Sequence, residues 1–104
     1  MGQGVPPRRI RVVVADDTPD MRLLLRLSMA RRPDIEVVGE AANGQEAIDL
    51  AAALRPDLLV LDLAMPVLDG LSALPTLALV APETRVVILS AMPVEAFATD
   101  ARSA

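Results

Sequence analysis

The sequence predicts a single α/β domain in which a parallel sheet is covered by helices on both faces. Short apolar runs alternate with segments of helical periodicity along the 104 residues, as in β-α-β units with right-handed crossovers. Residues 58–61 are apolar without interruption, which is typical of a strand buried on both sides. Asp62 follows this run directly, and open α/β sheets place their ligand chemistry at that end of a strand.

The composition argues against several kinds of function. Hydrophobic residues make up 53% of the chain and Phe97 is the one aromatic residue, so the expected core is aliphatic. The net charge of −4 argues against nucleic-acid binding by this segment. Because the chain lacks cysteine and histidine, it has no disulfide, no thiolate metal site and no histidine-activated nucleophile, which fits a reducing, cytoplasmic location. No apolar run reaches the roughly 20 residues that cross a bilayer, so we expect no membrane association.

The beginning of the chain predicts a tail followed by the first strand. Residues 1–9 are rich in glycine, proline and arginine and predict a flexible tail, so the domain is expected over residues 10–104. The β-branched run at residues 10–15 predicts the first strand, which ends at the acid pair Asp16 and Asp17.

A first helix is expected over residues 20–32, with Pro19 suited to its first turn. Apolar and basic residues recur in it at helical spacing, which predicts one buried and one solvated side. We expect Met21, Leu24 and Leu25 to face inward and Arg22 and Arg26 to face solvent.

The middle of the chain predicts a second strand over residues 35–42 and a second helix over residues 45–54, with Asn43 and Gly44 between them. The apolar residues of this helix have the i, i+3, i+4, i+7 spacing of a buried face, namely Ala47, Leu50, Ala51 and Leu54.

A turn is expected after the central strand. Pro66 cannot donate to a sheet, so it stops the strand direction. Asp69 and Gly70 then form a turn in which the aspartate can cap the following helix.

The last third of the chain predicts a third helix over residues 71–80, a fourth strand over residues 85–89 and a fourth helix from Pro93 onward. The third helix has no charged residue, and Pro75 removes one backbone donor from it. An uncharged surface helix predicts exposed apolar area.

Polar groups follow three of the predicted strands: Asp16 and Asp17, then Asp62, then Ser90. In a flavodoxin-like, doubly wound sheet of order 2-1-3-4, the first and third strands are neighbours, so the three carboxylates should meet. Their repulsion would be relieved by a divalent cation, and ligands that are all oxygens favour Mg²⁺ or Mn²⁺. Beside such a cation Asp62 could attack a phosphoryl group, with Ser90 donating a hydrogen bond to it.

Each of these residues also has a simpler interpretation. The acid pair could cap the first helix, Asp62 could be a strand-end acid that turns the chain, and Ser90 could be an ordinary strand-end serine. Their joint placement at matching strand ends favours the functional interpretation.

Three segments resemble the signatures of the response-regulator receiver domain, which has the CheY-like fold. These are residues 12–17 (VVVADD), 61–70 (LDLAMPVLDG) and 86–91 (VVILSA). Residues 36–47 are further similar to the NarL/FixJ-type regulators of transcription, whose DNA-binding output domain would lie outside this segment.

The resemblance implies a role for each residue of the cluster. Asp62 matches the phospho-acceptor, which takes its phosphoryl group from a sensor histidine kinase. Asp17 would ligate Mg²⁺ directly and Asp16 mainly through water, with Asp62 and the backbone carbonyl of Ala64 as further ligands. Ser90 matches the switch hydroxyl that moves toward the aspartyl phosphate.

The sequence also departs from the receiver pattern. A receiver has a fifth strand, ending in a lysine that pairs with the phosphoryl group, and a fifth helix; the chain ends 14 residues after Ser90 and contains no lysine. We expect a receiver that is truncated at its C-terminus, lacking the fifth strand and helix. The fourth strand would then be an open apolar edge, and we expect a homodimer, which could exchange elements between chains.

Two other kinds of function are weighed against this one. A receiver fold could serve as an interaction module that dimerises without phosphorylation, which the missing lysine favours. A phosphatase with an aspartyl nucleophile would need a second aspartate two positions after it, but Ala64 stands there, so we do not expect an enzyme.

Overall fold

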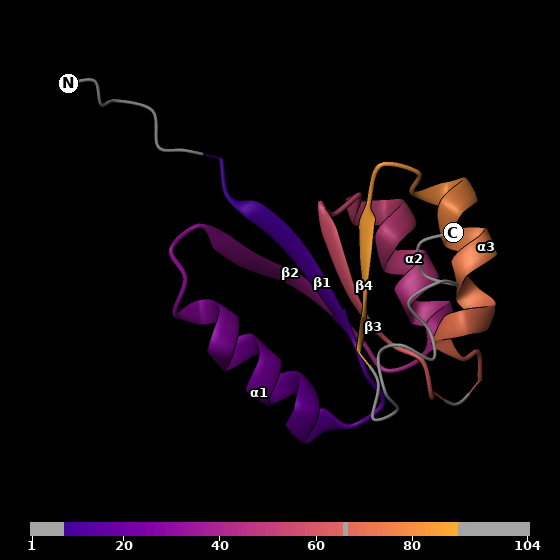
Figure 1. Cartoon of the computed structure of the whole chain (residues 1–104), viewed down its shortest axis with the longest axis horizontal. Helices are drawn as coiled ribbons and strands as arrows, with labels where there is room; N and C mark the ends of the chain where they lie inside the picture. The colour runs from indigo at the N-terminus through magenta and orange to yellow at the C-terminus, as the bar shows by residue number, and fades with distance from the viewer. Residues whose placement is uncertain (1–7, 66, 90–104) are drawn as a thin grey trace.

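The computed structural model describes residues 8–65 and 67–89, which form one parallel sheet with three helices (Figure 1). The strand order is β2-β1-β3-β4, which confirms the predicted flavodoxin-like order 2-1-3-4. No fifth strand or helix occurs among the described residues. The elements are β1 (Ile10–Ala15), α1 (Pro19–Ala30), β2 (Ile35–Ala41), α2 (Gly44–Leu54), β3 (Leu58–Asp62), α3 (Gly70–Val80) and β4 (Arg85–Leu89).

Four sequence predictions fall outside the described residues. They concern the N-terminal tail, the break at Pro66, the strand-end Ser90 and the helix from Pro93. Within the part of the chain that the structure describes, no helix is long and apolar enough to cross a membrane.

The helices form two unequal layers, as Figure 1 shows: α1 lies alone on one face of the sheet, and α2 and α3 cover the other. The larger core lies under α2 and α3 and includes the fully buried Val13, Leu59 and Leu61. The smaller core lies under α1 and is built from Val12, Val14 and Val60. This alternation along β1 and β3 follows from the two-residue period of a strand. Both faces of β3 are therefore covered, as its uninterrupted apolar sequence predicted.

The orientation of α1 differs from the prediction. Met21 is 37% exposed and Leu24 is 58% exposed, whereas Leu25 and Met29 pack on the sheet. Charge pairing explains the difference. Arg22 and Arg26 both form salt bridges with Glu40 of β2, and Arg22 also donates a hydrogen bond to the backbone carbonyl of Asp16. These contacts turn the arginine side of α1 toward β2 and leave Leu23, Leu24 and Leu27 facing solvent.

The cap of α3 by Asp69 is built as the sequence predicted, and α2 has a cap at Asn43 that was not predicted. The Asn43 side chain accepts a hydrogen bond from the Glu46 N–H at 2.9 Å, and the Glu46 side chain accepts one from the Ala42 N–H at 2.8 Å. Asp69 accepts a hydrogen bond from the Ser72 N–H at 2.7 Å, and this bond lowers the pKa of its carboxyl group. Such caps fix where each helix begins and, with it, the path of the loop before it.

Candidate phosphoryl-acceptor site

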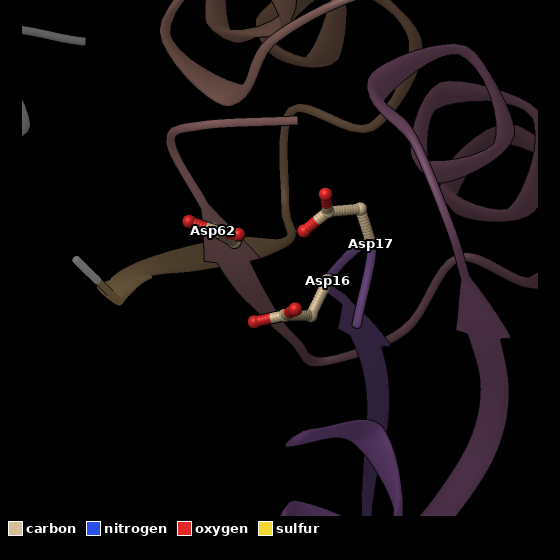
Figure 2. A group of neighbouring side chains, drawn as sticks. All are labelled: Asp16, Asp17 and Asp62. Carbon is tan, nitrogen blue, oxygen red and sulfur yellow. The ribbon is translucent and has the colours of Figure 1, made fainter. Parts of the chain in front are cut away.

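Three carboxylates meet at the carboxyl end of the sheet, as Figure 2 shows. Asp16 and Asp17 follow β1 directly, and Asp62 is the last residue of β3. β1 and β3 are hydrogen-bonded neighbours, so strands distant in sequence end side by side. One carboxylate oxygen from each residue lies within 4.8 Å of the others. The predicted cluster of acids is therefore present.

Asp16 is held by the turn between β1 and α1 and is 5% exposed. Its N–H donates to the carbonyl of Ala41 at 3.0 Å, and its carboxylate accepts from the Thr18 N–H at 2.8 Å. One carboxylate oxygen thus serves the turn before α1, and it does not cap the helix itself, which begins at Pro19. Because a carboxylate has two oxygens, the turn leaves Asp16 able to bind a second partner.

Asp62 lies at the rim of the cluster and is half-buried. Its carboxylate accepts a hydrogen bond from the Ala64 N–H at 3.1 Å, which holds the side chain at the strand end. Asp17 is exposed and faces the same space. Buried, half-buried and exposed acids together form a shallow anionic site that solvent can reach.

The environment of Asp62 raises the pKa of its carboxyl group. Burial is the largest cause, and the negative charges of Asp16 and Asp17 add to it. The hydrogen bond from the Ala64 N–H acts in the opposite direction. A raised pKa means that the folded protein resists ionisation of this group, as expected where like charges gather without a cation.

The donor set suits a hard divalent cation. All side-chain ligands are carboxylate oxygens, which Mg²⁺ prefers. The salt bridges formed by arginines within residues 8–65 and 67–89 involve Asp34, Glu40 and Asp57, and none involves the three clustered acids. The negative charge of the cluster is therefore not neutralised by any described side chain. Ala64 lies exposed just after Asp62, and its carbonyl as a ligand stays a prediction.

A hollow of about 470 Å³ opens beside the acids. One wall is formed by the carboxylates of Asp16 and Asp62, and the other by apolar side chains of α1 and β4. It is lined by Asp16, Thr18, Asp20, Met21, Leu24, Asp62 and Leu89. The apolar wall was not foreseen, because Met21 and Leu24 were expected to face the core.

Gly70 is a positioning residue whose role the sequence did not reveal. Its N–H donates to the carbonyl of Leu63 at 2.9 Å, which ties the start of α3 to the loop after Asp62. A Cβ at this position would lie 2.3 Å from the backbone oxygen of Asp62. The Asp-Gly pair could be recognised as a turn signal, but the close approach to Asp62 depends on the fold.

Comparison with known proteins agrees with this geometry. The family model of the response regulator receiver domain matches residues 12–104. A protein-glutamate methylesterase/protein-glutamine glutaminase from Geobacter sulfurreducens is 44% identical over 88 residues. This match covers 85% of the present chain but 24% of the relative, so the chain spans about a quarter of that relative's length.

Two solved structures have the same fold at appreciable identity. The response regulator domain of Thermotoga maritima CheB is 39% identical, with a TM-score of 0.87, and the match covers 92% of this chain and 72% of that one. The receiver domain of NarL from Mycobacterium tuberculosis is 34% identical, with a TM-score of 0.85, and the match covers 93% of this chain and 78% of that one.

Proposed function

This chain belongs to the response regulator receiver domain family, and on that premise we propose that Asp62 accepts a phosphoryl group in a Mg²⁺-dependent reaction. The observation that carries the proposal is the cluster of three carboxylates with Asp62 at the end of β3. Its oxygen would attack the phosphorus, and the bond from phosphorus to the donor would break with its electron pair leaving on the donor. The chain is the acceptor in this transfer and not an enzyme that turns over.

Some residues of the site would bind Mg²⁺, and others would orient the Asp62 carboxylate for its attack on phosphorus. Asp16, Asp17, Asp62 and the carbonyl of Ala64 would hold Mg²⁺, which supplies positive charge to the phosphoryl oxygens. The Ala64 N–H keeps the Asp62 carboxylate oriented at the strand end. No arginine salt bridge among the described residues involves the three acids, so within that part of the chain the metal would supply the positive charge at the site.

The proposal is tested with a small phosphodonor in the presence of Mg²⁺, followed by intact mass measurement. We expect the gain of one phosphoryl group, no gain after Asp62→Ala, and a strongly reduced gain after Asp17→Ala. Asp49→Ala, which removes an exposed acid of α2 away from the site, is the matched control and should be phosphorylated normally. An adduct that persists in Asp62→Ala would place the acceptor elsewhere.

Mg²⁺ should stabilise the folded wild-type protein, and removal of the Asp62 charge should stabilise the protein in the absence of metal. The raised pKa of Asp62 means that stability falls as pH rises through the folded-state pKa, so at neutral pH the ionised group destabilises the protein. Asp62→Asn should therefore raise the free energy of unfolding without metal, because it removes the ionised group that the folded state disfavours. Wild type should gain about 1.4 kcal/mol at roughly ten times the metal dissociation constant, and the variant much less.

These two effects are measured by thermal unfolding with and without Mg²⁺. The same scans in Ca²⁺ and in a matched concentration of NaCl separate site binding from screening of surface charge. Equal stabilisation of wild type and Asp62→Asn by Mg²⁺ would contradict a metal site that includes Asp62.

We infer that the phosphoryl donor is a sensor histidine kinase and that the transfer takes place in the cytoplasm. We also infer that two copies of the chain form a homodimer, in which the copies could exchange secondary-structure elements. The narrower resemblance to NarL/FixJ-type regulators is not supported by the curated relatives, which are named protein-glutamate methylesterases. The matched part is 24% of each of them, so the output domain lies outside the shared segment. We propose that phosphorylation signals to such a domain, whether it binds DNA or catalyses a reaction.

A second candidate is an interaction module that works without phosphorylation. The exposed leucines of α1 favour it. The two candidates differ in the mass experiment, because the interaction module would associate normally and show no adduct.

A further inference from the structure

The side of α1 that faces solvent carries three exposed leucines. Leu24 is 58% exposed, Leu27 is 56% exposed and Leu23 is 42% exposed. These leucines lie between two opposite charges, Asp20 in the first turn and Arg31 at the C-terminal cap. We call the set Asp20, Leu23, Leu24, Leu27 and Arg31 the α1 stripe.

Helix geometry places the ends of the α1 stripe on one side. Asp20 and Arg31 are 11 positions apart, which is about three turns at roughly 3.6 residues per turn. Arg31 has helical backbone angles (φ −76°, ψ −11°), so it continues the same surface. The two charges are therefore separated by about 16 Å along the axis, at 1.5 Å per residue, with Leu24 and Leu27 between them.

The α1 stripe is complementary to itself when a second copy is turned end for end. A two-fold axis midway between residues 25 and 26 places Leu24 opposite Leu27 of the other copy and Asp20 opposite Arg31 of the other copy. Each pair then occurs twice, as an isologous interface requires. We propose that two copies of this chain associate through antiparallel packing of their α1 helices along this stripe.

Charge distribution on the rest of α1 supports this register. Arg22 and Arg26 lie on the other side of the helix and are paired with Glu40 of the same chain. They therefore add no repulsion between copies. Asp20 and Arg31 form none of the salt bridges found among the described residues, so both remain available to a partner of opposite charge.

This inference deepens the proposed self-association and does not depend on phosphoryl transfer. Its test is sedimentation velocity of the whole chain over a concentration series from micromolar to millimolar. Asp20→Arg puts two arginines opposite two arginines, and Arg31→Asp puts two aspartates opposite two aspartates, so each variant should dimerise about tenfold more weakly or worse than wild type. An equimolar mixture should recover a dimer, because the all-arginine stripe then faces the all-aspartate stripe.

A pair of leucine variants controls for non-specific association. Leu27→Glu should abolish the dimer, whereas Leu79→Glu, at an 82% exposed position on α3 on the opposite face of the sheet, should leave it intact. Far-UV circular dichroism establishes that each variant is folded. A wild-type monomer throughout the series, no recovery in the mixture, or a dimer lost in Leu79→Glu but not in Leu27→Glu would each overturn the proposal. Phosphorylation of Leu27→Glu, read separately by mass, tests the proposed function independently, because Leu27 does not line the hollow beside Asp62.

Discussion

Leu59→Ala should lower the free energy of unfolding by about 2–5 kcal/mol, the range for removing a fully buried leucine without filling its space. Leu59 is 0% exposed and lies in β3, the strand that is paired on both sides, within the larger core under α2 and α3. Native domains are stable by about 5–15 kcal/mol, so the loss is a large part of the total. For a domain of this size it corresponds to a fall in Tm of roughly 10–25 °C.

Urea denaturation followed by circular dichroism measures this loss, and Leu79→Ala is the matched control. The same atoms are removed there from a side chain that is 82% exposed, so the change should stay within about 0.5 kcal/mol. Equal losses at the two positions would mean that β3 is not the centre of the core.

Much of the fold could be predicted because its signals are local. The apolar run before Asp62 has no polar residue to place at a surface, and this fixes β3 as a covered strand. The β-α-β pattern predicts a parallel sheet, and the flavodoxin-like strand order adopted for it brings Asp16 and Asp17 to Asp62. Capping by Asp69 was also predictable, because its side chain acts on a backbone group three residues away.

The side of α1 that packs on the sheet could not be predicted from the sequence of the helix alone. Leucines stand at four positions of this helix, so periodicity alone does not choose one apolar side. The choice comes from Glu40, a residue of β2 that pairs with Arg22 and Arg26. Such a contact between elements is invisible to a pattern within one helix, and it creates both the apolar wall of the hollow and the α1 stripe.

The close approach at Gly70 is equally a property of the assembled fold. A Cβ there would lie 2.3 Å from the Asp62 backbone oxygen and 2.9 Å from the Leu63 Cα, distances that real Cβ atoms do not adopt. Both neighbours are backbone atoms, so no side-chain rotation can relieve the contact. Either the start of α3 or the segment that carries Asp62 has to move.

Gly70→Ala should therefore damage stability and the acid cluster together. Alanine is a better helix former than glycine by about 1 kcal/mol, but the forced backbone shift should outweigh this gain and leave a net loss of about 1–3 kcal/mol. Displacement of Asp62 should also reduce the rise in Tm produced by Mg²⁺ and slow phosphorylation by a small donor. Urea denaturation, thermal scans with Mg²⁺ and intact mass measure the three effects.

Gly39→Ala is the matched control for this glycine substitution. Its Cβ would lie 3.2 Å from the Leu54 Cδ1 and 3.4 Å from the Leu50 Cδ1, both of them ends of flexible side chains. We expect a change within about 1 kcal/mol, with the Mg²⁺ response and phosphorylation retained, because Gly39 lies in β2 away from the acids. If Gly70→Ala were as mild as Gly39→Ala in all three measurements, the start of α3 would not position Asp62. If it lost stability but kept the full Mg²⁺ response, α3 would support the fold without controlling the geometry of the site.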